Sequence, residues 1–220
     1  IRDSLDEGEN SIRHNRSRDI PKLRLGASST LTRYVLLSHL ENYIAHFPHV
    51  RITISCQSTY QTLHLLDEEK IDLGLIGRPQ KLRGYYFHPL LKIRDTFVCT
   101  RQYLENQKKL YPDEPLIQAA TFMMLDEDNI TRQTVNAQLK EHHVELSHIL
   151  EVTTMDLLIQ FAEIGLGIAC VIRDFVKKEL EEGTLVEVPV GFSFPPREIG
   201  FVCRQKDANL DLIVPFFGEE

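Results

Sequence analysis

The strongest constraint on the fold of this chain is a regular alternation of strand-like and helix-like patterns in its first third. Residues 23–25, 50–55 and 71–76 carry the apolar positions typical of strands, and the last run is apolar enough to be buried on both faces of a sheet. Between them, residues 31–47 and 59–66 carry apolar side chains at helical spacing. This βαβαβ order predicts a parallel sheet with right-handed crossovers.

The first of these helices is predicted to be amphipathic and to end at Pro48. Its apolar pattern comprises Leu31, Tyr34, Val35, Leu40, Ile44 and Phe47. Polar residues that can cap helices precede it, and others precede the second helix. The sequence therefore places hydroxyl groups at the start of each helix in the first unit.

The alternation returns later in the chain. Strand-like runs at residues 121–125, 148–152 and 168–172 are separated by helical patterns at 129–142 and 155–164. Another helix (174–182), a strand (185–190), a strand (198–204) and a short terminal helix (210–217) follow. Gly165 is expected just after a helix, where φ is often positive, and Gly167 where backbones approach closely. The sequence therefore predicts a second α/β unit.

Two similar strand-like segments bracket this second unit. Residues 95–101 (DTFVCTR) and 198–205 (EIGFVCRQ) both have Phe-Val-Cys near their centres. They predict a chain that crosses to a second lobe and returns, although two edge strands of one sheet would give the same pattern. On the two-lobe interpretation, residues 20–97 and 203–220 form lobe I, and residues 98–202 form lobe II.

Charge argues against nucleic-acid binding by this chain alone. The formal net charge is −7, and basic residues are scattered apart from a short group near the start. No apolar run approaches the roughly 18 residues that a membrane helix needs, and the charged start lacks the apolar region of a secretory signal. We therefore expect a cytoplasmic protein that does not enter a membrane.

No pattern in the sequence indicates a metal, a cofactor or a catalytic residue. The four cysteines (Cys56, Cys99, Cys170, Cys203) form no CxxC pair, and we expect all four to be reduced and buried. The nine histidines show no metal-binding spacing, and the chain has no P-loop and no GxSxG motif.

The order of several short motifs resembles the effector-binding domain of LysR-type transcriptional regulators. No single motif is specific, but their order and spacing match over residues 20–217. The motifs are LRLGA (23–27), FPHV (47–50), IDLGLI (71–76), GLGIA (165–169) and GTLV (183–186).

This resemblance implies a fold like that of type II periplasmic binding proteins: two Rossmann-like α/β lobes, joined by two crossover strands, with a small-molecule effector in the cleft. It implies that residues 1–19 are the remnant of a linker helix. It also implies that DNA binding belongs to an N-terminal helix-turn-helix domain of the parent protein, a motif that is not found ahead of Ile1 in this sequence. It also implies a homodimer or tetramer, in which the first helix packs against the helix at 155–164 of a partner. Leu36, Leu37 and Tyr43 would then face outward.

Loops at the carboxyl ends of the strands are the expected effector site, because helix starts present free N–H groups there. Each candidate hydroxyl also has a simpler interpretation as a helix cap. The resemblance adds Thr100, on the first crossover, to the cleft. The full set of candidates is Ser28, Ser29, Thr30, Ser58, Thr59, Thr100, Asp128, Thr153, Thr154 and Met155.

The charge of the effector stays open at this point. Hydroxyls and free amides suit a carboxylate, whereas Asp126, Glu127 and Asp128 would favour an amine, as in an amino acid. Arg101 and Arg132 lie nearby in sequence and offset these acids, or all five are solvated loop charges. Two other functions share the fold: a free-standing solute-binding protein of a transporter, and an enzyme with a catalytic group assembled from distant residues.

Overall fold

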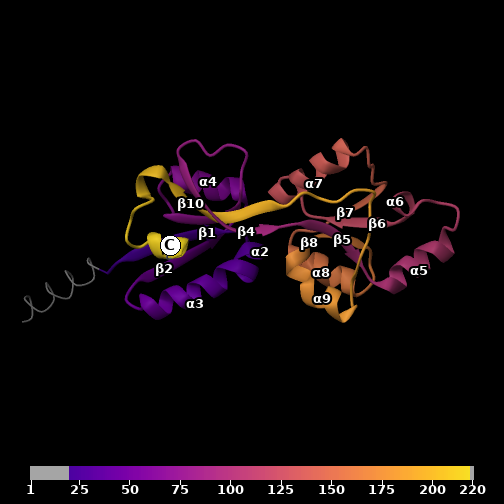
Figure 1. The fold of residues 1–220 in the computed structure, drawn as a ribbon, viewed down its shortest axis with the longest axis horizontal. Coiled ribbons are helices and arrows are strands. Elements are labelled where there is room, and N and C mark those ends of the chain that lie inside the picture. The colour runs from indigo at the N-terminus through magenta and orange to yellow at the C-terminus, as the bar shows by residue number, and fades with distance from the viewer. Residues whose placement is uncertain (1–19, 219–220) are drawn as a thin grey trace, which may run out of the picture.

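The computed structural model describes residues 20–218 and divides them between two five-stranded sheets. The first sheet has the strand order β2-β1-β3-β10-β4, and the second has the order β7-β6-β8-β5-β9. Figure 1 shows the two lobes side by side along the long axis, with β10 running between them. The two-lobed α/β architecture expected from the sequence is confirmed.

Lobe I contains the predicted βαβαβ unit. Strands β1 (Lys22–Ala27), β2 (Arg51–Cys56) and β3 (Leu73–Gly77) are parallel. Helix α4 (Thr59–Asp67) connects β2 to β3. Strand β3 is buried along its whole length, as expected for a strand covered on both faces.

The first helix of lobe I is interrupted by a π-helical segment. A short α2 (Ser29–Leu31) leads into η1 (Thr32–Leu36), which is π-helical, and then into α3 (Leu37–His46). A π segment adds one residue to a turn, so the faces of the helix that follows rotate by about 100°. As a result Leu36 and Tyr43 are buried and Ile44 is exposed, and the prediction that Leu36 and Tyr43 face outward is wrong.

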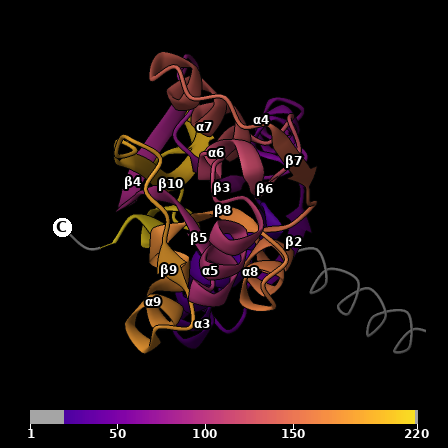
Figure 2. The same ribbon diagram turned by 90° about the vertical axis from the view of Figure 1, so that its right-hand side faces the viewer.

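Lobe II is a mixed sheet flanked by helices. Its parallel core comprises β6 (Thr121–Met124), β7 (His148–Glu151) and β8 (Ile168–Ile172), and β5 (Asp95–Cys99) and β9 (Val186–Glu187) complete it. Its helices are α5 (Arg101–Leu110), α6 (Leu116–Ala119), α7 (Ile130–Glu141), α8 (Met155–Glu163) and α9 (Lys177–Glu182), with the 3₁₀ turn η2 (Arg173–Val176) before α9. Figure 2, which looks along the long axis, shows how these helices surround the sheet.

The chain crosses between the lobes twice. It passes from β4 (Tyr85–Ile93) through Arg94 into β5, and it returns to lobe I before β10 (Arg197–Arg204). Strand β10 pairs antiparallel with β3 and β4, whereas β5 pairs with β8 and β9. The two Phe-Val-Cys segments therefore belong to different sheets, and the expected lobe boundaries at 97/98 and 202/203 fall inside β5 and β10.

Several local predictions need correction. The terminal segment forms no α-helix; it contains the 3₁₀ turns η3 (Gln205–Asp207) and η4 (Val214–Phe217), and Pro215 occupies the start of η4. Cys56 is exposed because it ends the edge strand β2, while the other three cysteines are buried. The expected linker helix at residues 1–19 lies outside the described residues.

Two glycines behave as predicted. Gly165 follows α8 with φ of 79°, and a side chain at Gly167 would meet the carbonyl oxygen of Thr121 at 2.7 Å. In the described part of the chain, no helix is both long enough and apolar enough to cross a bilayer.

Candidate functional site

The starts of three helices meet at one cavity between the lobes. Helix α4 comes from lobe I, and α7 and α8 come from lobe II. The cavity has a volume of about 40 Å³, which is room for a few water molecules. Its lining comprises Ser28, Thr30, Leu31, Ser58, Thr59, Gly77, Leu125, Asn129, Ile130, Thr131, Met155, Ile172, Arg197 and Ile199.

Half of the predicted site residues line this cavity. They are Ser28, Thr30, Ser58, Thr59 and Met155. Two of the five also cap helices: the Ser58 Oγ accepts from the Gln61 N–H in a capping box with the Gln61 side chain, and the Ser28 Oγ accepts from the Leu31 N–H. Capping and a place in the cavity are therefore compatible at the same residue.

Four other candidates lie beside the cavity without lining it. Thr154 caps α8 through the Leu157 N–H, and Thr153 precedes it. Ser29 begins α2 between two residues that do line the cavity, and Asp128 is exposed just before the cavity-lining Asn129. Ligand contact at these four positions stays a prediction.

Thr100 is placed away from the cavity, which corrects the expectation from the resemblance. Its Oγ1 accepts from the Tyr103 N–H and caps α5. The crossing between the lobes occurs at Arg94, so Thr100 follows β5 at the opposite end from Asp95. Five strand residues advance the chain by roughly 16 Å, which separates the two ends of β5.

Residues that the sequence patterns did not single out also line the cavity. Asn129, Ile130 and Thr131 form the start of α7, and the Asn129 side chain accepts from the Thr131 N–H. Arg197 enters from the first residue of β10. Asn before an amphipathic helix is a capping signal that would have pointed to the α7 start, whereas no local pattern around Arg197 marks it as a cavity residue.

Arg197 links the two lobes at the crossover. Its Nε and Nη2 donate to the two carboxylate oxygens of Asp95 at 2.8 and 2.9 Å, and Nη2 also donates to the Thr131 Oγ1 at 2.8 Å. Arg197 belongs to the sheet of lobe I, whereas Asp95 and Thr131 belong to lobe II. The side chains are 16% and 1% exposed for Arg197 and Asp95, so water screens this ion pair weakly.

Other contacts hold the lobes together around the cavity. The Tyr60 hydroxyl, on α4, donates to the Gln133 Oε1 on α7 at 2.9 Å. On the α2–α8 side, the Arg33 Nη1 lies 2.8 Å from the Asp156 Oδ2. These contacts, with the small cavity, describe lobes that are closed on one another.

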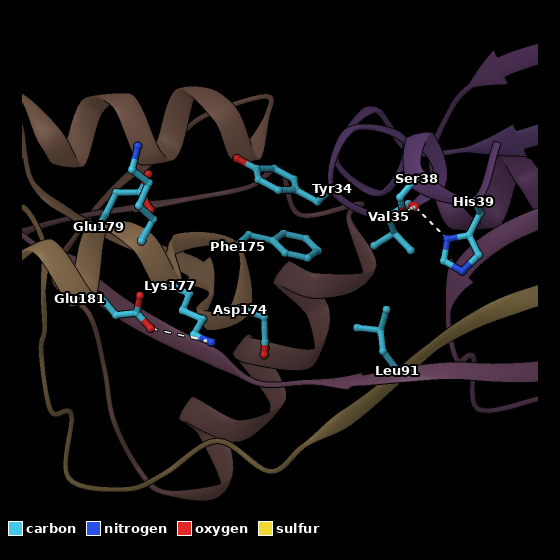
Figure 3. Close-up of a pocket in the computed structure, with 11 residues that line it drawn as sticks. Tyr34, Val35, Ser38, His39, Leu91, Asp174, Phe175, Lys177, Glu179 and Glu181 are labelled. Carbon is cyan, nitrogen blue, oxygen red and sulfur yellow. Dashed lines mark hydrogen bonds and ion pairs between the residues drawn. The ribbon is translucent and has the colours of Figure 1, made fainter. Parts of the chain in front are cut away.

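A larger groove lies between η1 of lobe I and the η2–α9 segment of lobe II. It has a volume of about 610 Å³ and is open to solvent. Figure 3 shows the Tyr34 and Phe175 rings facing one another in this groove; their centroids are 4.4 Å apart and their planes differ by 5°. Burial, with the Asp156 carboxylate beside it, raises the pKa of Tyr34 to about 12, so its hydroxyl stays protonated at neutral pH.

The groove has few features of a ligand site. Lys177 lies 3.8 Å from Glu181 along α9, so its charge is already balanced. Helix α3 (Leu37–His46) begins beside the groove, but it continues directly from the helical segment η1 and so presents no free helix start there. The inter-lobe cavity, where three helices begin, is therefore the better candidate.

The three acidic residues that left the charge of the effector open are exposed to solvent. Asp126, Glu127 and Asp128 are exposed and do not line the cavity. Arg132 is buried instead, and its Nη1 donates to the Leu125 carbonyl oxygen at 2.6 Å. Residues 20–218 contain no group of three His, Cys, Asp or Glu side chains that could hold a metal ion.

Comparisons with known proteins identify the family of this chain. Residues 17–217 match the family described as LysR substrate binding domain. The chain is 24% identical over 179 residues to the HTH-type transcriptional regulator YeiE of Escherichia coli K12 and 25% identical over 168 residues to the HTH-type transcriptional regulator CbbR of Rhodospirillum rubrum. These alignments cover 76% of this chain but only 57% and 55% of the two relatives.

Solved structures show the same fold at lower identity. The regulatory domain of HypT from Salmonella typhimurium superposes with a TM-score of 0.73 at 16% identity, covering 90% of this chain and 92% of that one. A variant of the OxyR2 regulatory domain from Vibrio vulnificus gives a TM-score of 0.71 at 18% identity, covering 90% and 93%. This chain spans a little over half the length of the curated regulators it matches first.

Proposed function

Because the chain belongs to the family of LysR substrate-binding domains and is an effector-binding regulatory domain of the LysR type, we propose that its effector binds in the inter-lobe cavity. The observation that carries this proposal is the convergence of the α4, α7 and α8 starts, from both lobes, on one cavity. A ligand there touches both lobes at once. It can therefore stabilise one lobe arrangement over another.

The switch acts by differential affinity. An effector shifts the equilibrium between lobe arrangements only by the difference in its affinity for them. Contacts such as Tyr60 with Gln133 and Arg197 with Thr131 join the two lobes in the closed arrangement of this structure. An effector that adds bonds across the same gap favours closure, whereas one too large for about 40 Å³ holds the lobes apart.

A thermal-shift screen of metabolites, followed by cavity variants, tests this site. A true effector raises the melting temperature in a dose-dependent way. Thr30→Val and Thr59→Val keep the side-chain shape but remove a hydroxyl from the cavity lining, so we expect each to reduce the effector-induced shift. Thr184→Val, on an exposed turn of lobe II, is the matched control and should leave the shift unchanged. Equal shifts in all variants would contradict the proposed site.

In the full-length protein, we propose that the chain controls DNA binding through a separate DNA-binding domain. Support comes from the relatives, which are HTH-type transcriptional regulators almost twice as long as the matched region. The net charge of this chain is −7, which makes its surface poorly suited to binding the phosphates of DNA. A regulator of this kind acts in the cytoplasm.

The residues that line the cavity favour ligand binding without catalysis over an enzymatic function. General acid–base or nucleophilic catalysis needs a titratable or nucleophilic group near the reacting atoms. Among the described residues that line the cavity, Arg197 is the one ionisable side chain, so the lining offers no carboxylate or imidazole base to activate its serine and threonine hydroxyls. The family match also favours a regulator over a free-standing solute-binding protein of a transporter.

We propose that the chain forms a homodimer through α3 and α8. Leu37 and Ile44 on α3, and Leu157 and Ile164 at α8, are exposed apolar side chains. In a two-fold arrangement, each α3 packs on the partner's α8, so both patches are buried twice.

Light scattering tests the dimer. We expect a mass near twice 25.4 kDa for the wild type, and Leu37→Glu should shift the population toward monomer because it places a charge in an apolar interface. Leu110→Glu, at another exposed apolar position on α5, is the control and should leave the mass unchanged. A wild-type chain that stays strictly monomeric at high concentration would contradict this interface.

A further inference from the structure

One charged side chain lines the inter-lobe cavity. Of the described lining residues, only Arg197 carries a charge, and no carboxylate is among them. Asp95 lies behind Arg197 in β5 and does not line the cavity. An effector inside the cavity therefore meets a cation directly.

Two of the three guanidinium nitrogens of Arg197 are occupied. Nε and Nη2 form the two parallel bonds to Asp95, and Nη2 also bonds to Thr131. This fork geometry fixes the plane of the guanidinium, because rotating it breaks two charge-assisted hydrogen bonds. Asp95 thus holds Arg197 in place.

The third nitrogen, Nη1, has no hydrogen-bond partner among residues 20–218. It lies beside Gly77, another cavity-lining residue, and a Cβ at that position would be 3.4 Å from it. Glycine therefore leaves Nη1 approachable from the cavity. A guanidinium N–H that is largely removed from water and unbonded is a strong site for an acceptor.

The helix starts also favour an anion over a cation in the cavity. Helices α4, α7 and α8 have 9, 12 and 9 residues, and each directs its positive end at the cavity. An ammonium group would meet these positive ends and Arg197 without a carboxylate to pair with.

We propose that the cavity selects a small anion, which accepts a hydrogen bond from the Arg197 Nη1, and that Asp95 is the positioning residue for this contact. The proposal rests on the cavity being the effector site and names the class of effector: an inorganic oxyanion or the carboxylate of a small organic molecule. The volume of about 40 Å³ admits only a compact group while the lobes are closed. Because Arg197 is in lobe I and its partners are in lobe II, the anion bonds to the residue that ties the lobes together.

Nuclear magnetic resonance of the ¹⁵N-labelled 220-residue chain tests the proposal. Sodium sulfate, phosphate, acetate and succinate are titrated separately at constant ionic strength, with sodium chloride as the reference. The signals to follow are the backbone amides of Thr59, Thr131 and Met155 and the Arg197 Nε–H. We expect at least one of the four anions to shift these signals saturably, and which one does so separates inorganic oxyanions from carboxylates.

Variants then assign the contact to Arg197. Removing Arg197 alone leaves Asp95 buried and unpaired, so the double variant Asp95→Asn with Arg197→Gln keeps a neutral pair and protects folding. We expect about 10- to 100-fold weaker binding of that anion in the double variant, the loss of one charge-assisted hydrogen bond. Arg78→Gln is the matched control: Arg78 pairs with Glu198 next to Arg197 but does not line the cavity, and its loss should leave the affinity unchanged.

Two results would overturn the proposal, and they differ in what they say of the cavity. If the folded double variant binds the anion as tightly as the wild type, Arg197 does not select it, although the cavity stays the effector site. If none of the anions shifts the cavity signals while a neutral or cationic metabolite does, the effector is not an anion. A metabolite whose shifts map only outside the cavity contradicts the proposed function itself.

Discussion

At the scale of single residues, Cys56 shows how burial decides chemistry among identical side chains. Burial raises the pKa of Cys99 to about 12 and that of Cys203 to about 11, and it raises the pKa of Cys170 well above its ordinary value. Cys56, at the end of the edge strand β2, is exposed. A reagent must reach the sulfur to react with it, and Cys56 is the one cysteine of the four that is exposed.

A thiol-reagent titration checks this difference. At pH 8 the native chain should react with one equivalent of an aromatic disulfide reagent, and Cys56→Ser should react with none. Unfolding in guanidinium chloride should raise the count to four in the wild type and three in the variant, because all thiols become accessible. Two or more fast-reacting thiols in the native protein would contradict the burial of Cys99, Cys170 and Cys203.

Arg197 marks the limit of residue-level prediction. Its ion pair joins residues that are 102 positions apart in the sequence, and its role depends on two strands that belong to different sheets. Serines and threonines at helix starts were predictable because caps are local. A partner that is brought together by the crossover leaves no local signal.

At the scale of elements, the sequence predicted which segments are strands and helices better than which faces they bury. The βαβαβ order of lobe I and the buried β3 and β8 followed directly from apolar runs. The π-helical segment Thr32–Leu36 did not, because regular helical periodicity assumes 3.6 residues per turn throughout. One extra residue was enough to turn Tyr43 inward and Ile44 outward in α3.

Two adjacent leucines, one buried and one exposed, test which face of this helix points into the core. Leu36 is 1% exposed and Leu37 is 55% exposed. Leu36→Ala should lower the free energy of unfolding by about 2–5 kcal/mol because it leaves a cavity in the core, whereas Leu37→Ala should change it by roughly 0.5 kcal/mol or less. Urea unfolding of dilute protein measures both. Similarly small effects for both variants would contradict the rotation, because an uninterrupted helix places both leucines on its outward face.

The pairing of β1 with β3 is reinforced by Asp72, just before β3. The Arg24 backbone N–H and guanidinium both donate to its carboxylate. Burial by itself would raise the pKa of Asp72, but these hydrogen bonds and the nearby positive charges outweigh it and hold the pKa below its ordinary value of 3.8.

This pKa shift predicts an acid-dependent contribution to stability. A carboxyl with a lowered folded-state pKa stabilises the fold fully above its unfolded pKa, and the contribution is lost as the pH falls through the folded-state value. The difference in unfolding free energy between the wild type and Asp72→Asn should therefore be constant from pH 6 to 7 and should shrink progressively below about pH 4. Denaturant titrations at several pH values measure it, and a difference that is independent of pH would refute the assignment.

At the scale of the whole molecule, the two-lobed architecture was predictable and the details of the connection were not. Repetition of the α/β pattern predicted two units, and the paired Phe-Val-Cys segments indicated two crossings. Their similar sequences gave no information on pairing partners, so the membership of β5 and β10 in separate sheets emerged only in three dimensions. For the same reason Thr100 lay away from the cavity although it followed the first crossover.

The closed lobes place the candidate site at the point where both halves of the molecule meet. Effector binding there should reduce solvent access at the helix starts and leave the outer faces of the lobes unaffected. The open groove beside Tyr34 and Phe175 provides an internal comparison, because it also lies between the lobes but contains no convergent helix starts.

Hydrogen–deuterium exchange with a stabilising effector from the thermal-shift screen tests the central claim most directly. The account predicts slower exchange in peptides that cover the starts of α4, α7 and α8, with contributions from both lobes. Protection confined to the groove around Phe175 and α9, or to the outer helices of a single lobe, would contradict it.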